Sequence, residues 1–274
     1  MHFNSLFARG YVMHKNPEEI AMRRLLIALP LLTLAACSDG PDSHPIDPNH
    51  LPPLSGKEQA LMVAADGEIR QGDTDSAIRD YQSAAAHSEG HIDAHLALAK
   101  LYISQQQSAP ARDVLERALK LQPNDPEANY LLGKILIDQN HPREAAQHFS
   151  AGLVTAPNNA QLLNGSGIAA DALGDHKAAQ GYYQQALMNA GTDDKPMLRT
   201  NLGMSYLLDN NPKKAIDILK PEAHKPGASP VTRQDLALAY GLLGRPVDAK
   251  NAVKNEMTEE EREAALERLK AYLK

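Results

Sequence analysis

Small and large apolar residues recur along this chain with a period of 34 residues. Each period contains an alanine or glycine and, twelve positions later, a second alanine. The first set is Ala65, Ala99, Gly133, Gly167, Gly203 and Ala237, and the second is Ala77, Ala111, Ala145, Ala179, Ala215 and Ala249. One step is longer by two residues, which fall in the stretch Gly191–Lys195. A fixed period of this length predicts six copies of one structural unit.

Each unit has room for two short helices joined by a turn. Counted from Glu58, the twenty-fourth position of every unit holds a large apolar residue, and the apolar residues around it follow a helical stripe. These residues are Tyr81, Leu115, Phe149, Tyr183, Leu219 and Val253. We expect the small residues to lie where the two helices of a unit approach each other most closely.

The fifteenth position of each unit is predicted to end the first helix. It holds Gly72, Gln106, Asn140, Gly174, Asn210 and Gly244. Glycine and asparagine adopt the left-handed backbone conformation at low cost, and this conformation is common just after a helix. Gln106 departs from the pattern, so we expect a different turn in the second unit.

Helix-turn-helix units of 34 residues resemble the tetratricopeptide repeat (TPR). The resemblance covers residues 58–257 and implies an all-α TPR superhelical solenoid of about six repeats. It has departures, because no unit has the usual tryptophan at its fourth position. Arrays of this kind are binding surfaces, so the resemblance implies a function through protein partners and not an enzyme.

Residues 258–274 predict one further helix after the repeats. Thr258 and Glu261 have the spacing of a capping box, which is typical of a helix start. The apolar stripe that follows consists of Ala265, Leu266, Leu269, Tyr272 and Leu273. We expect this C-terminal capping helix to cover the apolar end of the solenoid.

The first 36 residues have the order of a signal peptide. Arg23 and Arg24 precede an apolar run over residues 25–34, which is short for a transmembrane helix. The run ends in Leu-Ala-Ala-Cys, which closely resembles the lipobox of bacterial lipoproteins. The resemblance implies cleavage before Cys37, which then carries the lipid. An ordinary secretory signal with an incidental cysteine is the alternative.

Residues 37–57 are predicted to form a flexible, proline-rich tether behind the lipidated cysteine. Ser38 stands where an aspartate would hold an enterobacterial lipoprotein at the inner membrane. The resemblance therefore favours the outer membrane, with the repeats facing the periplasm. Residues 1–21 are interpreted as an upstream extension, because Met22 would give the signal a conventional start.

Charge and motifs narrow the function further. The formal net charge is −6, and no basic stripe marks a nucleic-acid surface. We find no phosphate-binding loop, nucleophile elbow or zinc-protease motif, and we expect no cofactor and no small-molecule substrate. His87, His91 and His95 have a spacing that binds metal on a continuous helix, but the register places the first two at a helix end and a turn. A metal-dependent enzyme is therefore the least favoured interpretation.

The first helix of each TPR unit lines the concave face of the array. In the front units the inward positions include Lys100, Lys134 and Asp138. In the last two units they hold Met197, Met204, Leu207, Leu208, Leu238 and Leu242. Such an apolar strip suits an amphipathic partner helix, to which methionine side chains adapt. The alternative is that these side chains belong to the core and the facing is shifted by one residue.

The last two units carry a more specific resemblance. The stretches Asn201–Tyr206 and Arg233–Gly244, and the linker Pro226–Pro230 between them, look like the TadD lipoproteins of the tight-adherence (Flp) pilus machinery. The resemblance implies an outer-membrane scaffold for pilus biogenesis that binds the secretin, or another pilus assembly protein, in the manner of a pilotin. A general envelope adaptor is the alternative, either similar to type IV pilotins or recruiting peptidoglycan or outer-membrane assembly factors.

Overall fold

The computed structural model describes residues 53–88 and 90–254 of the chain. Every regular element in these residues is an α-helix, which confirms the predicted fold class. No helix among them is both long and apolar enough to cross a membrane. The predicted signal peptide, Cys37, most of the predicted tether and the predicted capping helix lie outside the described residues. The helices are α2 (Gly56–Gln71), α3 (Thr74–Ala86), α4 (Asp93–Ser104), α5 (Ser108–Leu121), α6 (Pro126–Asp138), α7 (Pro142–Thr155), α8 (Ala160–Ala172), α9 (His176–Asn189), α10 (Lys195–Leu208), α11 (Pro212–Ala223), α12 (Pro230–Leu242) and α13 (Pro246–Ala252).

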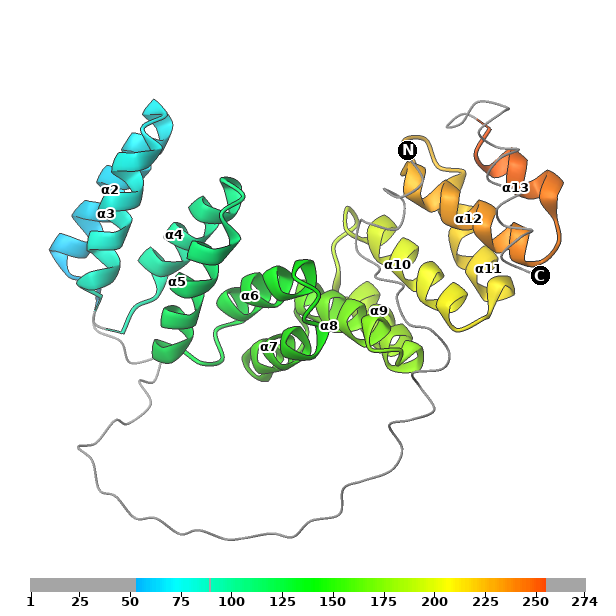
Figure 1. The fold of residues 1–274 in the computed structure, drawn as a ribbon, viewed down its shortest axis with the longest axis horizontal. Coiled ribbons are helices and arrows are strands. Elements are labelled where there is room, and N and C mark those ends of the chain that lie inside the picture. The colour runs from blue at the N-terminus through cyan, green and yellow to red at the C-terminus, as the bar shows by residue number, and fades with distance from the viewer. Residues whose placement is uncertain (1–52, 89, 255–274) are drawn as a thin grey trace, which may run out of the picture.

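These helices form six antiparallel pairs, from α2 with α3 to α12 with α13, and each pair is one predicted unit. The pairs follow an arc, and its two ends lie on the same side of the central helices α7 to α9 (Figure 1). In the middle and rear of the array the first helices also pack on one another, α6 on α8, α8 on α10 and α10 on α12. Helices on the inner side of a curved array lie closest together. The first helices therefore form the concave layer, as predicted.

The small residue at the eighth position of a unit makes room for the large residue at the twenty-fourth. A Cβ atom on Gly167 would lie 2.5 Å from the ring of Tyr183, and one on Gly203 would lie 2.5 Å from Leu219. Both large side chains are fully buried. The predicted close approach is thus confirmed, and its physical cause is a side chain of the second helix that packs directly on the backbone of the first.

All six first helices end in the same hydrogen-bonded turn. In each unit the N–H of the sixteenth residue donates to the carbonyl of the eleventh at 2.8–2.9 Å, for example from Gln107 to Tyr102 and from Asn211 to Tyr206. This is the six-to-one bond of a Schellman motif, which requires a positive φ at the fifteenth residue. Gln106 adopts that conformation with a φ of 59°, close to the 62° of Asn140. The expectation of a different turn in the second unit was wrong, because the two backbone bonds of the motif outweigh the modest cost of a non-glycine residue there.

Glu222 occupies a position that holds a small residue in the four preceding units. Its side chain is buried in α11, and its carboxylate accepts hydrogen bonds from Arg199 at 2.6 Å and from Lys225 at 2.7 Å. Two cations on either side offset the cost of burying the carboxylate. An ion pair between α10 and α11 thus stands where the preceding units have a small residue.

Candidate protein-binding surface

Half-exposed apolar side chains line α10 and α12 at matching repeat positions. On each helix the spacing is i, i+7 and i+11, which places the three side chains on one face. The set, which we name the rear strip, is Met197, Met204 and Leu208 on α10 and Val231, Leu238 and Leu242 on α12. Met197 and Val231 are 51% and 53% exposed, and the other four are half-buried. The rear strip therefore presents apolar surface on two adjacent helices of the concave layer.

The rear strip differs from the predicted set in two residues. Leu207 is only 7% exposed and packs in the core with Tyr206 and Leu219, so it does not belong to the surface. Val231 was missed, although it shares its repeat position with Met197 and the register alone would have identified it.

In the front half, the predicted charged residues are on the surface. Lys100, Lys134 and Asp138 are all exposed. The ammonium group of Lys100 pairs with the carboxylate of Glu127 at 2.7 Å, which links α4 to α6 across neighbouring units. Both partners are about half exposed, so the ion pair adds little stability, about 1 kcal/mol at most. Its charges remain accessible to a partner.

An apolar row accompanies these charges. The twelfth position of the first three units holds Ile69, Ile103 and Ile137, and all three side chains are exposed or half-buried. The concave face therefore does not change simply from charged to apolar along the array. From α2 to α6 it carries apolar side chains with charged residues beside them. From α10 to α12 it carries apolar side chains with fewer charged residues.

A buried polar network joins the fourth and fifth units. This network was not predicted from the sequence. The side chain of Asp171 is fully buried at the end of α8. It accepts hydrogen bonds from Ser205 at 2.8 Å and Tyr183 at 3.1 Å and is 2.9 Å from Nδ1 of His176. Burial raises the pKa of Asp171, and the bonds from His176 and Ser205 oppose that rise.

The network has the residue types of a catalytic triad but not its geometry. Ser205 donates to Asp171, whereas a nucleophilic serine donates to the histidine that acts as its base. All of these groups contact the same carboxylate, which thereby links α8, α9 and α10. We interpret the network as a structural link behind the concave face. The signal in the sequence was a single aspartate at a position that is isoleucine in the first three units.

Asp235 on α12 predicts a pH dependence of stability. It is 5% exposed, and burial raises its pKa to about 7. A raised folded-state pKa gives stability that is present below the unfolded value near 4 and is lost as the pH rises through 7. Asp235→Asn should therefore melt like the wild type at pH 4 and be more stable at pH 8, by on the order of 2–4 kcal/mol. Thermal melts at both pH values test this; an equal difference at both would contradict it.

The three histidines of the sequence analysis do not converge. His87 caps the end of α3, His91 lies in the turn before α4, and His95 is buried within α4. This arrangement follows the predicted register. Within residues 53–88 and 90–254, no group of three or more potential metal-binding side chains lies together.

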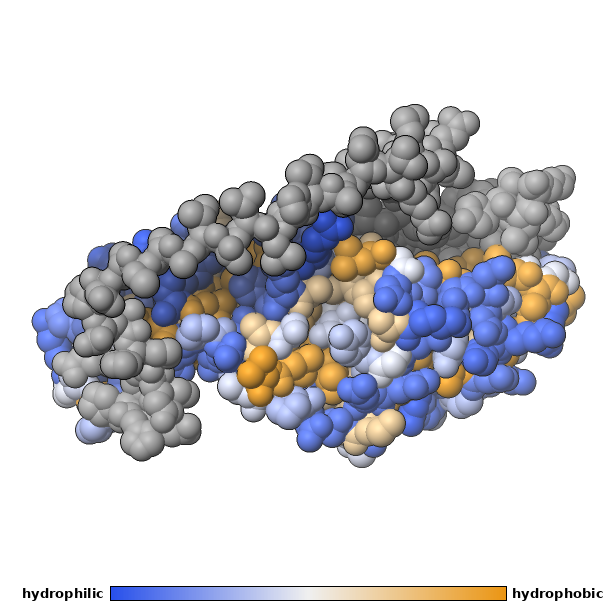
Figure 2. Space-filling view, turned by 90° about the horizontal axis from the view of Figure 1, so that it is seen from below, coloured by the Kyte–Doolittle hydropathy of each residue, from blue (hydrophilic) through white to orange (hydrophobic). Residues whose placement is uncertain are grey.

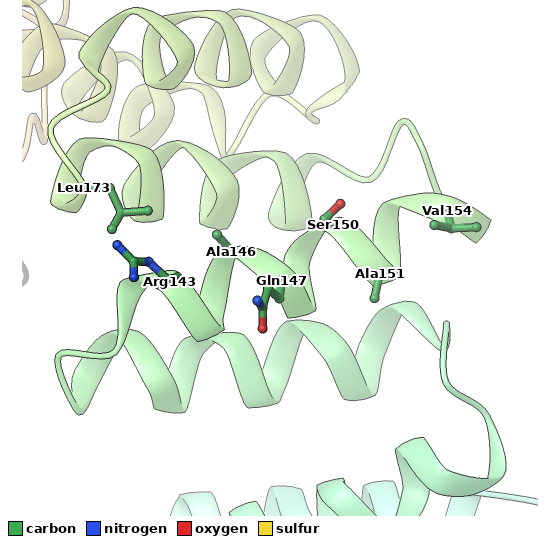
Figure 3. Close-up of a pocket in the computed structure, with 7 residues that line it drawn as sticks. All are labelled: Arg143, Ala146, Gln147, Ser150, Ala151, Val154 and Leu173. Atoms are coloured by element: carbon green, nitrogen blue, oxygen red, sulfur yellow. The ribbon is translucent and has the colours of Figure 1, made fainter. Parts of the chain in front are cut away.

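A shallow hollow lies along the second-helix layer. Its volume is about 590 Å³, and six of its lining residues follow one face of α7 while Leu173 comes from the end of α8 (Figure 3). Arg143 is the only charged residue among the seven. The view from below the arc shows mostly hydrophilic residues with smaller hydrophobic groups between them (Figure 2). The hollow has no converging polar groups to orient a small molecule.

Comparison with known proteins supports the repeat assignment. Residues 68–135 and 109–166 match the tetratricopeptide repeat family model. The chain is 36% identical over 105 residues to the uncharacterized protein y4yS of Sinorhizobium fredii, covering 37% of this chain and 57% of that protein. It is 24% identical over 159 residues to the human protein O-mannosyl-transferase TMTC1, covering 53% of this chain and 18% of that protein. The chain thus spans less than two thirds of the length of these curated relatives.

Solved structures share the fold at low sequence identity. PilW, described as a widely conserved type IV pilus biogenesis factor, has a TM-score of 0.63 at 19% identity and covers 77% of this chain and 99% of its own. PilF of Pseudomonas aeruginosa has a TM-score of 0.57 at 16% identity, covering 72% and 88%. MamA of Desulfovibrio magneticus has a TM-score of 0.55 at 19% identity, covering 61% and 94%.

Such identities establish the fold and nothing finer. Proteins of this fold are typically non-enzymatic scaffolds that bind other proteins. The family match over residues 68–166, the six described helix pairs and the shared structures agree with one another. The described residues therefore have the all-helical solenoid fold of tetratricopeptide repeats.

Proposed function

We propose that this protein is a scaffold for pilus biogenesis that binds an amphipathic segment of a pilus assembly protein along its concave face. The rear strip carries the proposal, because two adjacent helices present apolar side chains at the same three repeat positions. A partner helix that lies across α10 and α12 would bury both rows together. The fold shared with PilW and PilF, and the resemblance to the TadD lipoproteins, support a partner among pilus proteins.

The proposal extends to a pilotin-like task at the outer membrane. Lipid attached at Cys37 would anchor the chain, and residues 38–56 would separate the repeats from the bilayer. Nineteen residues in an extended, proline-rich conformation span at most about 60 Å. The concave face would then reach a secretin subunit while the anchor stays in the membrane.

The anchor gives an all-or-none prediction. Cys37→Ser removes the thiol that would carry the lipid, so the protein should leave the membrane fraction or accumulate as an unprocessed precursor. Fractionation of cells, with the mass of the mature N-terminus measured, tests this. Processing and localisation like those of the wild type would reject the lipoprotein interpretation.

The proposed partner is tested by affinity capture. The chain without its signal and Cys37 is immobilised and incubated with detergent extract of the cell envelope. We expect retention of the secretin or another pilus assembly protein, with its loss on the rear-strip variant Leu208→Glu. Retention of peptidoglycan or outer-membrane assembly factors instead would reject the pilus role and favour a general envelope adaptor.

A further inference from the structure

Asp235 lies between the two rows of the rear strip. On α12 it follows Val231 by four residues and precedes Leu238 by three, so these side chains share one side of the helix. With about 3.6 residues per turn, Asp235 is rotated by about 40° from the centre of the α12 row, in the direction of Thr232. The hydroxyl of Thr232 is 2.7 Å from that of Thr200 on α10, so this side of α12 faces α10. Asp235 therefore separates the apolar row of α12 from that of α10.

The carboxylate of Asp235 is buried without a partner. The residue is only 5% exposed, and burial is the one cause of its raised pKa. Among residues 53–88 and 90–254, no cation and no hydrogen-bond donor therefore acts on this group. The buried carboxylates of Asp171 and Glu222, by contrast, accept hydrogen bonds from side chains of neighbouring helices. A buried carboxylate without such compensation is costly.

The repeat does not require a charge at this position. Asp235 holds the sixth position of its unit, and the other five units have uncharged residues there, namely Val63, Ala97, Leu131, Gly165 and Asn201. All of these units form the same pair of helices. The carboxylate also lowers the stability of the free protein above pH 7, as the expected gain from Asp235→Asn expresses. A group that the fold does not need and that reduces stability is typical of a functional site.

A basic side chain of a bound protein segment suits this position. Lysine and arginine lay their aliphatic stems along apolar surface and carry the charge at the tip. Met204 and Leu238 supply half-buried apolar surface in the two rows, and Asp235 supplies the opposite charge between them. A metal ion would need further ligands, and in the part of the chain that the structure describes no group of three potential ligands includes Asp235.

We infer that the segment bound by the rear strip inserts a lysine or arginine between α10 and α12, where its charge pairs with Asp235. The inference rests on the proposed binding surface and adds a specificity-determining contact to it. Apolar side chains of the segment, one helical turn to either side of the basic residue, contact the two rows. A purely apolar segment leaves the carboxylate buried and unpaired, and an acidic residue at this point is repelled. Both are therefore disfavoured relative to the basic segment.

Selection of peptides tests the inference without knowledge of the natural partner. A phage-displayed library of helical peptides, with one face randomised, is selected at pH 8 on the immobilised full chain and on Asp235→Asn. We expect peptides selected on the wild type to share one lysine or arginine between apolar positions. Peptides selected on Asp235→Asn should keep the apolar positions and lose the basic one. The same basic position on both proteins, or none on the wild type, would overturn the inference.

Leu208→Glu distinguishes a failure of the inference from a failure of the proposed surface. The selected peptides should bind this variant about tenfold or more weakly than the wild type. If that loss occurs but the peptides share no basic position, the surface is correct and the role of Asp235 is wrong. If no peptide is selected, or if Leu208→Glu binds the peptides unchanged, the rear strip is not a binding surface and both proposals fail.

A double-mutant cycle then measures the contact itself. Norleucine in place of the basic residue of a selected peptide should weaken binding to the wild type about tenfold or more. The same replacement should change binding to Asp235→Asn less than about twofold, because the charge has no partner there. Asp217→Asn is the matched control, since it removes an exposed aspartate from α11, and it should behave like the wild type. Titration calorimetry gives the four affinities, and equal effects on the wild type and Asp235→Asn would contradict the pairing.

Discussion

Gly167→Leu should cost about 3 kcal/mol of unfolding free energy, or prevent folding altogether. Its Cβ atom would lie 2.5 Å from the fully buried ring of Tyr183, so the ring would have to move. Overpacking of a core typically costs ~1–3 kcal/mol, and this position belongs at the upper end. Movement of the ring would also break the hydrogen bond from Tyr183 to Asp171, which helps to join the fourth and fifth units. Circular-dichroism melts measure the loss.

Gly181→Leu is the matched control. Gly181 also lies within a helix, but a Cβ atom there would meet nothing within 4 Å. Replacement of an unconstrained helical glycine usually stabilises a protein by about 0.5–1 kcal/mol. Ala145→Leu, at the buried second small position of the third unit, should be destabilising like Gly167→Leu. Equal melts for Gly167→Leu and Gly181→Leu would show that the assigned register is wrong.

The periodic part of this structure could be predicted from the sequence because it is repeated six times. A single alanine does not identify a helix contact. Alanine or glycine at two positions twelve residues apart in every unit does, because both positions lie where the two helices of a unit pack together. The turns could be predicted as well, because glycine and asparagine, as at Gly72 and Asn140, readily adopt the left-handed backbone conformation that ends the first helix. Gln106 was misjudged because propensity was weighed residue by residue, whereas the hydrogen bonds of the turn are decided by the whole motif.

The candidate site was harder to predict because it depends on small rotations between units. Leu207 and Leu208 are neighbours, yet one is buried and the other half-exposed. An error of one residue in the facing therefore exchanges core for surface. The Asp171 network depends on contacts between α8, α9 and α10 that are specific to these units. No repeated sequence pattern therefore predicts it.

Leu208→Glu should weaken partner binding about 30-fold or more while the protein remains folded. The side chain is half-exposed at the end of α10, so the new carboxylate stays in contact with water and should change stability by no more than about 1 kcal/mol. A charge within an apolar interface is unpaired when a partner covers it. Central anchors of an interface commonly contribute ~2 kcal/mol or more each, which corresponds to a 30-fold or greater loss of affinity.

Leu242→Glu should have the same effect on binding with a somewhat larger effect on stability. Leu242 holds the matching position on α12 but also packs against the buried core of the last two units. Leu207→Glu is the control for burial, because it places a carboxylate in the core next to Leu208. It should unfold the protein, since an unpaired buried charge costs several kcal/mol. Comparison of these two adjacent substitutions distinguishes a loss of partner binding from a loss of folding.

The most direct measurement compares Leu207→Glu, Leu208→Glu and the wild type in paired assays. Each protein is melted by circular dichroism, and each is then immobilised to measure retention of the captured pilus assembly protein. A concave binding surface predicts that Leu208→Glu melts within a few degrees of the wild type and retains little partner, while Leu207→Glu does not fold. A normal melt of Leu208→Glu together with undiminished retention would contradict the rear strip as the binding surface.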